Sequence, residues 1–252
     1  MYHVARGRWA LPVLAGLAAA LALLVGAGGR ALAAQAAGGR QLPIYSVETP
    51  ERLVALGINC AWDDSGLGEL LALLEERGVK ATFFLVGEWC ERYPQAANRL
   101  AQAGHELGSH SQTHRDMTQL DRAQIAWELE ASATAIRAAT GQSPRLFRPP
   151  SGAYNDLVIA TARQLGWEAV QWDVDSLDWQ EPPVEEMVER VCAKCRPGSI
   201  LLWHLGKPDT PDALAQALDR LQGEGYRFCT VGELLYPPPY RLDHTGRQFP
   251  EG

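Results

Sequence analysis

The chain has 252 residues, of which 46% are hydrophobic and 21% are charged, and its formal net charge is -7. A chain of this length and composition can bury a full core, which excludes disorder as the default state. The negative charge and the lack of a basic cluster interleaved with aromatic residues exclude nucleic acid as the expected partner.

The first predicted element is an apolar stretch at the N-terminus. Arg6 and Arg8 precede an apolar run over residues 9–27, and small residues follow it. This layout is typical of a secretory signal peptide, and the run is also long enough to anchor the protein in a membrane. We therefore assign residues 1–33 to a signal peptide or membrane anchor, and we expect an extracytoplasmic protein, secreted or anchored at the cell envelope.

A linker and lead-in over residues 34–50 precede the predicted folded domain, residues 51–236, and residues 237–252 form a C-terminal tail. Within the domain, short apolar runs bounded by Gly, Pro or polar residues predict strands. The predicted strands are Leu53–Ile58, Ala81–Val86, Glu106–Ser109, Leu146–Arg148, Glu168–Trp172, Ser199–Trp203 and Arg227–Thr230.

Longer amphipathic segments between these strands predict helices, and a glycine follows five of the helix ends. The predicted helices are Leu70–Arg77, Trp89–Ala103, Arg122–Thr140, Asn155–Leu165, Val184–Lys194 and Asp212–Glu224. Repeated alternation of strand and helix indicates an α/β fold with parallel strands and crossover helices, and six or seven such units favour a closed or partly closed barrel. Active-site residues are then expected just after the C-terminal ends of the strands.

The five cysteines are an odd number for a protein in an oxidising compartment, so at least one is expected to be unpaired. Cys192 and Cys195 form a Cys-X-X-Cys pair on a predicted helix, without the second pair that would complete a four-ligand zinc site. We interpret the cysteines as structural.

The clearest candidate for chemistry is a pair of histidines, His110 and His114, which follow the predicted strand Glu106–Ser109. Their four-residue spacing lets both imidazoles converge on one ion, and neutral imidazole is a good ligand for zinc and similar metals.

Ionisable side chains also follow several other predicted strands. Asp63 and Asp64 follow the first strand, and Arg148 follows Leu146 and Phe147. Asp173, Asp175 and Asp178 follow the fifth strand, and His204 follows the sixth. Any one of these could be a solvated loop residue, but together they indicate an active site at one edge of the barrel.

Seven segments in order carry a resemblance to the polysaccharide deacetylase family, the NodB-homology carbohydrate esterases, over nearly all of residues 43–235. They are Lys80-Ala-Thr-Phe-Phe84, Gly104-His-Glu-Leu-Gly108, His110-Ser-Gln-Thr-His114, Phe147-Arg-Pro-Pro-Ser-Gly152, Trp172-Asp-Val-Asp-Ser-Leu-Asp-Trp179, Ile200-Leu-Leu-Trp-His204 and Gly225-Tyr-Arg-Phe-Cys-Thr-Val-Gly-Glu-Leu-Leu235. The segment Pro43–Thr49 and the pair Ala61-Trp62 are most similar to the sporulation-associated branch of that family.

The resemblance implies a distorted (β/α)7 barrel and a metal-dependent hydrolase that removes acetyl groups from an N-acetylated glycan, such as peptidoglycan, spore cortex or a chitin-like polymer. It implies a divalent metal, zinc or else cobalt or another ion, held by His110, His114 and an Asp. The metal polarises the acetyl carbonyl and activates a water, an Asp serves as base, and a late histidine protonates the leaving amine.

Further roles follow from the same resemblance. His204 matches the acid, Asp175 matches the carboxylate that hydrogen-bonds to the acid, and Arg148 matches the residue that orients the base. The aromatic residues Tyr154, Trp172 and Trp179 are candidates for lining the sugar groove. We expect a monomer.

The family's first motif, Thr-Phe-Asp-Asp-Gly, has no direct copy here, and two alignments remain open. The ungapped register places Asn59 and Cys60 at the two aspartates. The alternative slides Trp62-Asp63-Asp64-Ser65-Gly66 onto the motif. We favour the ungapped register for the backbone, with Asp64 as metal ligand and Asp63 as base.

The degenerate motif also leaves the function open between two classes. An amide at position 59 cannot take up a proton near neutral pH, so turnover would then be weak or lost. The alternative to an active deacetylase is therefore a catalytically impaired homologue that binds glycan in the envelope or during sporulation. A related hydrolase acting on a non-sugar amide is a third hypothesis.

Overall fold

A computed structural model describes residues 40–251 of the chain. Residues 41–252 form one compact unit. The predicted signal peptide or anchor, residues 1–33, lies outside the described residues. None of the helices in the described part is both long and apolar enough to cross a membrane.

The centre of this unit is a curled sheet in which all strands run parallel. Its strands are β2 (Leu53–Cys60), β3 (Thr82–Leu85), β4 (Glu106–Ser109), β5 (Leu146–Phe147), β6 (Glu168–Ala169), β7 (Val174–Asp175), β8 (Ile200–His204) and β9 (Arg227–Cys229). Their order is β6-β5-β4-β3-β2-β8-β7, and β9 pairs with the first residues of β2. The seven predicted strands are all present, and the last part of the predicted strand Glu168–Trp172 is instead irregular chain that leads to the separate strand β7.

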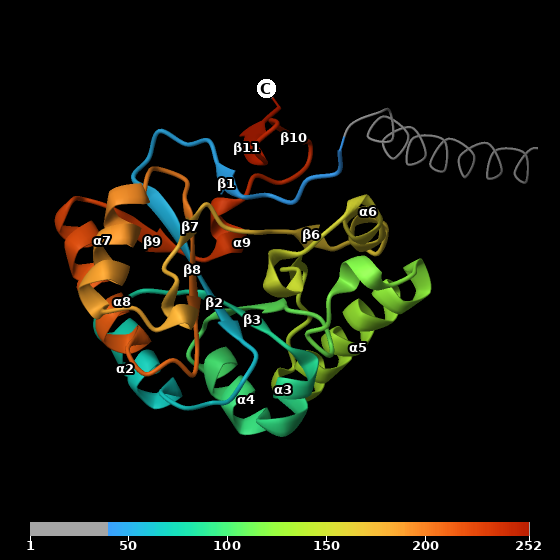
Figure 1. The fold of residues 1–252 in the computed structure, drawn as a ribbon, viewed down its shortest axis with the longest axis horizontal. Helices are drawn as coiled ribbons and strands as arrows, with labels where there is room; N and C mark the ends of the chain where they lie inside the picture. Colours follow the sequence, from blue (N-terminus) through green and yellow to red (C-terminus); the bar gives the residue numbers. More distant parts are fainter. Residues whose placement is uncertain (1–39, 252) are drawn as a thin grey trace, which may run out of the picture. The chain divides into compact units, whose positions relative to one another are not determined.

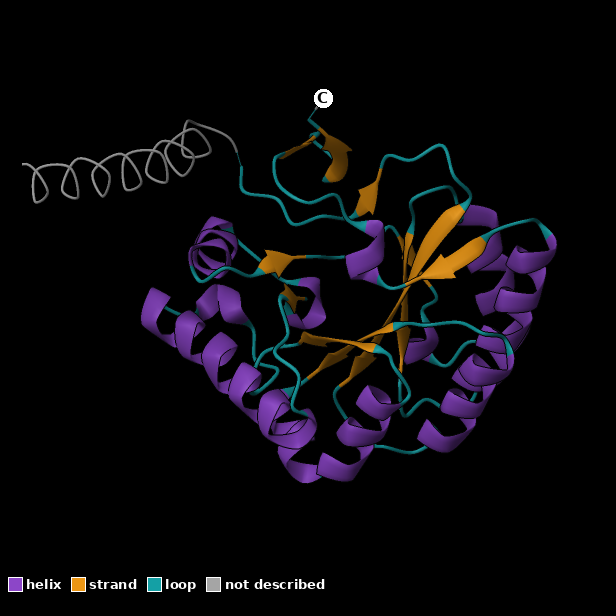
Figure 2. Cartoon of the chain, turned by 180° about the vertical axis from the view of Figure 1, so that it is seen from behind, coloured by secondary structure: helices purple, strands orange, loops and turns teal. Residues whose placement is uncertain are grey.

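The helices lie around the outer face of the curled sheet, as both cartoon views show (Figures 1 and 2). They are α2 (Leu67–Glu76), α3 (Gly87–Arg92), α4 (Pro94–Gln102), α5 (Arg122–Thr140), α6 (Asp156–Gln164), α7 (Val184–Lys194), α8 (Thr210–Gly223) and the short α9 (Val231–Leu234). The predicted helix Trp89–Ala103 is in fact two helices, because Pro94 starts α4 at a position where its missing N–H costs nothing. The expected distorted (β/α)7 barrel is thus confirmed.

The sheet is open between its end strands β6 and β7, and the N-terminal segment of the described chain crosses the opening. The N–H of Ile44 donates to the carbonyl of Ala169, and the N–H of Gln171 donates to the carbonyl of Ile44. A small second sheet lies beside this segment, in the order β1-β11-β10 (Ser46–Val47, Arg247–Pro250, Tyr240–Leu242). The C-terminal residues therefore pack on the same body as the barrel.

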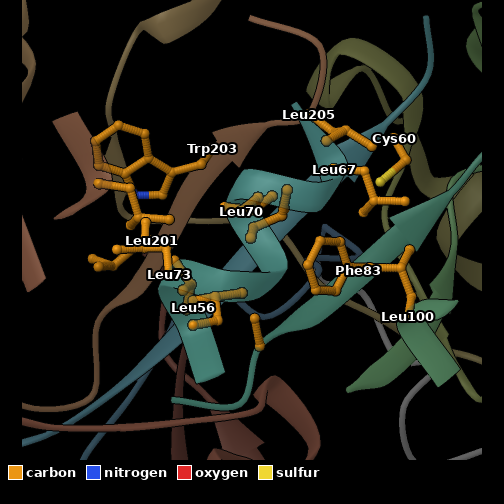
Figure 3. Packing of buried hydrophobic residues seen from close by; sticks show 14 of the residues in the cluster. Leu56, Cys60, Leu67, Leu70, Leu73, Phe83, Leu100, Leu201, Trp203 and Leu205 are labelled. Atoms are coloured by element: carbon orange, nitrogen blue, oxygen red, sulfur yellow. The ribbon is translucent and has the colours of Figure 1, made fainter. Parts of the chain in front are cut away.

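Alternation along β2 separates the core from the inside of the barrel. Leu56, Ile58 and Cys60 point outward into the main hydrophobic cluster between the sheet and its helices. Figure 3 shows the Cys60 sulfur beside Leu67 and Leu205. The intervening residues Gly57 and Asn59 point inward instead, because successive side chains of a strand face opposite sides.

Candidate active site

The inward-facing residues at the C-terminal ends of the strands surround a pocket of about 450 Å³, within the usual size range of small-ligand sites. Its walls come from segments far apart in the sequence. The lining residues are Asn59, Ala61, Trp62, His110, His114, Ser151, Trp172, Asp175, Trp179, Leu202 and His204. The rule that sites form at strand ends therefore located the pocket correctly.

The two predicted metal histidines lie together in this pocket, with ring centroids 4.9 Å apart. His110 Nδ1 donates to the backbone carbonyl of Arg148 at 2.7 Å, so the lone pair of its neutral ring is on Nε2, as in metal-binding histidines. Burial is the main cause that lowers the pKa of His110 well below its usual value, and it also lowers that of His114. Both rings are thus held in the neutral form that a metal requires.

The loop that carries the pair is held by Glu128, a buried residue of α5. The Glu128 carboxylate accepts hydrogen bonds from the N–H groups of Gln112 and Thr113, at 2.8 and 2.9 Å, and from the Thr113 hydroxyl at 2.6 Å. His114 has a φ of 57°, a left-handed conformation that is unfavourable for a residue with a side chain. Glu128 is therefore a positioning residue that the strand-end pattern did not predict.

His204, at the end of β8, forms an ion-pair geometry with Asp178. Its Nδ1 lies 2.6 Å from Asp178 Oδ1, and its backbone N–H donates to Asp178 Oδ2 at 2.7 Å. The Thr210 hydroxyl also donates to Asp178 Oδ2 at 2.8 Å. This arrangement leaves Nε2 of His204 as the atom that faces the pocket.

The prediction that Asp175 hydrogen-bonds to His204 is therefore wrong. Asp178 is the carboxylate that pairs with His204. The chain turns through Leu177, whose φ is 61°, and this turn brings Asp178 back toward β8. Asp175 Oδ1 instead accepts the backbone N–H of Leu177 at 2.8 Å, although Asp175 still lines the pocket.

Arg148 is fully buried beneath the pocket and is bonded to neutral acceptors. Its Nη1 donates to Asn59 Oδ1 at 3.0 Å and its Nη2 donates to the Gln171 carbonyl at 3.2 Å. Burial lowers the Arg148 pKa to about 9. Asn59 Nδ2 lies 3.5 Å from His204 Nε2. Asn59 thus occupies the position between arginine and acid where the resemblance implies a base, in agreement with the ungapped register.

Asp63 and Asp64 do not join this group. Both are exposed on the loop after β2 and neither lines the pocket. Asp63 Oδ1 accepts hydrogen bonds from the backbone N–H and the hydroxyl of Ser65, and these bonds are the main cause that lowers the Asp63 pKa. The loop bends back to begin α2, which explains why the predicted ligand Asp64 and the predicted base Asp63 are not at the site.

A metal ion would find an incomplete set of donors here. No group of three or more His, Cys, Asp or Glu residues able to hold a metal exists among residues 40–251. Catalytic zinc sites use three protein ligands, whereas here His110 and His114 form a pair, His204 is bonded to Asp178, and Cys60 lies in the core. The residues present therefore do not fit the predicted three-ligand site.

The three aromatic residues predicted to line a sugar groove do not all lie at the pocket. Trp172 and Trp179 line the pocket, whereas Tyr154 does not. The Tyr154 ring packs against the cluster under α6, and its hydroxyl lies 3.2 Å from that of Tyr45. Trp62 lines the pocket but was not predicted as a site residue, and the only signal for it was its place in the Ala61-Trp62 pair.

Comparison with known proteins gives consistent matches. The family model described as polysaccharide deacetylase matches residues 46–170. The uncharacterized protein YlxY of Bacillus subtilis is 36% identical over 193 residues, which cover 77% of this chain and 60% of YlxY. A peptidoglycan-N-acetylglucosamine deacetylase of Bacillus cereus is 33% identical over 196 residues, which cover 76% of this chain and 92% of that protein.

Among solved structures, BA3943 of Bacillus anthracis is described as a CE4 family pseudoenzyme. It is 36% identical, with a TM-score of 0.75, over 78% of this chain and 69% of that chain. A mutant of BA3943 described as having restored enzymatic activity has the same TM-score and identity.

Proposed function

Because the chain belongs to the polysaccharide deacetylase family and is a hydrolase of that type, we propose that it binds an acetylated glycan of the cell envelope in the pocket around His204 and removes acetyl groups slowly. The pairing of His204 with Asp178 carries this proposal, because the chain retains both residues that a proton donor to the leaving amine requires. Relatives named as peptidoglycan deacetylases support an envelope glycan as substrate and an extracytoplasmic place of action.

The chemical step that the chain can still perform is protonation of the leaving group. Hydrolysis of an N-acetyl group breaks the bond between carbonyl carbon and nitrogen, and the departing amine needs a proton. The Asp178 carboxylate fixes the Nδ1–H of His204, so Nε2 is the atom that delivers a proton from the imidazolium to the amine.

The step that we expect to be slow is the attack of water on the acetyl carbonyl carbon. Asn59 holds a water by hydrogen bonding at best, since an amide cannot accept its proton. Deacetylases of this family are generally metal-dependent, and we propose that this chain holds zinc, or cobalt in its place, only weakly through His110 and His114. Loss of a general base alone typically costs about 10²–10⁴-fold in rate.

The second candidate is a protein that binds glycan without turnover. The observation that favours it is the pair Asn59 and Cys60, a neutral amide and a buried thiol at the two positions of the degenerate motif. The description of the similar BA3943 as a pseudoenzyme supports it as well.

Acetate release from peptidoglycan and chitooligosaccharides, measured with added zinc or cobalt, separates the two candidates. We expect slow release by the wild type that exceeds release by His204→Ala, and faster release by Asn59→Asp. Glycan binding with release equal to that of His204→Ala would establish the second candidate. A folded wild type that neither binds nor deacetylates any of these glycans would contradict both.

A further inference from the structure

Trp62 is unusual because it is a large apolar side chain left in water beside the pocket. Only three large hydrophobic residues are exposed in the described part of the chain, Trp62 and Trp179 at 46% and Trp127 at 54%. Trp62 and Trp179 line the pocket, whereas Trp127 lies on α5 and does not. Exposed aromatic surface gathered at one site indicates a place where a ligand covers it.

Two side chains of the protein contact the Trp62 ring. Its centroid lies 5.4 Å from that of the His204 ring, and Lys207 Nζ lies 5.0 Å from the Trp62 centroid. Lys207 is itself fixed, because its ammonium donates to Glu181 Oε1 at 3.0 Å. A ring that is already ordered loses little conformational entropy when it binds, which favours its use as a binding surface.

The sheet order places Trp62 and Trp179 on the two sides of His204. Trp62 follows β2, His204 ends β8, and Trp179 lies in the short 3-10 helix after β7. Since β8 lies between β2 and β7, the strand that carries His204 is flanked by the strands that lead to the two indoles. Aromatic surface therefore extends to both sides of the proton donor.

The charges of the pocket lining point to an uncharged ligand. Among the described residues that line it there is no Lys or Arg, and Asp175 is a carboxylate. Lys207 has its charge matched by Glu181, and Arg148 is fully buried below the lining. A sugar that carries a carboxylate would thus meet no free cation and would face Asp175.

We propose that Trp62 is a specificity-determining residue that stacks on the apolar face of a neutral N-acetylhexosamine ring next to His204, so that the site prefers N-acetylglucosamine chains over sugars that bear a carboxylate, such as N-acetylmuramic acid. This inference rests on the proposed function, since it requires that the pocket binds glycan. Trp179 provides the corresponding surface on the other side of β8.

The test is calorimetric titration of the folded protein with chitotetraose and with a muramic acid-containing disaccharide. Truncation of an aromatic hot-spot residue at the centre of a binding site costs about 1 kcal/mol or more, so Trp62→Ala is expected to bind chitotetraose at least about fivefold more weakly. Trp62→Phe should recover most of the affinity. Trp127→Ala removes an exposed indole away from the pocket and is the matched control, with unchanged affinity expected.

Chitotetraose affinity of Trp62→Ala within twofold of the wild type, with wild-type binding intact, would overturn this inference and leave the proposed function standing. Equal or tighter binding of the muramic acid disaccharide would overturn the preference for a neutral sugar. If Trp62 served only to support His204, Trp62→Ala would lower acetate release without weakening binding, which would also overturn it. A wild type that binds no glycan would overturn the proposed function itself and this inference with it.

Discussion

Asn59→Asp is the substitution with the sharpest expected outcome, because it places a negative charge on a side chain that already contacts a buried cation. Arg148 Nη1 already donates to Asn59 Oδ1 at 3.0 Å, so a carboxylate of nearly the same shape accepts the same bond. Hydrogen bonds to charged groups contribute about 1.5–3 kcal/mol and neutral ones about 0.5–1.5 kcal/mol. Desolvation of the new carboxylate offsets part of the difference, which leaves a gain of about 1 kcal/mol.

The pKa of Arg148 gives the sign of this effect. Burial lowers that pKa to about 9, below its usual value, so at neutral pH the folded protein bears the full cost of holding the charged guanidinium. This cost is relieved only as the pH rises above about 9, because the pKa of Arg148 is higher in the unfolded chain. A carboxylate at position 59 compensates the charge directly, so the variant should be stabilised at pH 7.

Thermal unfolding at pH 7 measures the outcome. For a domain of this size, 1 kcal/mol corresponds to a shift in Tm of about 2–4 °C, so Asn59→Asp should unfold about 2–4 °C above the wild type. Asn59→Ala, which removes the acceptor, should unfold below it. The acetate-release rate of Asn59→Asp should rise toward the factor of about 10²–10⁴ that a base supplies. A variant as unstable as Asn59→Ala would refute the contact between position 59 and Arg148.

Three further predictions test other contacts. Asp178→Asn should lower acetate release by about 10²-fold or more, while Asp175→Asn should cost less than about tenfold, and the reverse order of rates would restore the original assignment. Gly57→Ala should destabilise the protein by about 1–3 kcal/mol in urea unfolding, because its Cβ would lie 2.5 Å from Arg148 Nη2, and an unchanged midpoint would contradict that packing. Glu128→Ala should lower Tm more than Glu128→Gln, which can still accept hydrogen bonds from the histidine loop, and equal losses would argue against that role.

The strands and most helices could be predicted because their signals are local. Short apolar runs, amphipathic periods and terminal glycines lie within a few residues of one another, and the parallel arrangement follows from their alternation. The small sheet of β1, β10 and β11 could not be predicted in this way. Its pairing joins Ser46 to Arg247, and no local pattern reports contacts so distant in the sequence.

The site residues also differ in how well their positions could be predicted from the sequence. The structure brings His110, Arg148 and His204 together because each lies at or just beyond the end of a strand, where topology alone fixes the position. Asp63 and Asp175 were misplaced because their positions depend on loop conformation. A hydrogen bond to Ser65 turns the first carboxylate away, and the second is followed by a left-handed turn that brings a different aspartate to His204.

Asn59 and Cys60, at the two aspartate positions of the first motif, have different surroundings because successive side chains of β2 face opposite sides. Asn59 faces inward and keeps the shape and the hydrogen bond that Arg148 needs, so a single change of amide to carboxylate can be accommodated there. Cys60 faces outward among Leu67 and Leu205, where a small apolar side chain fills the core. A register slipped by four residues would bring Asp63 inward but would also place Asp64 in that core, and an unpaired buried carboxylate is costly. The packing of β2 therefore favours the register that places Asn59 beside Arg148.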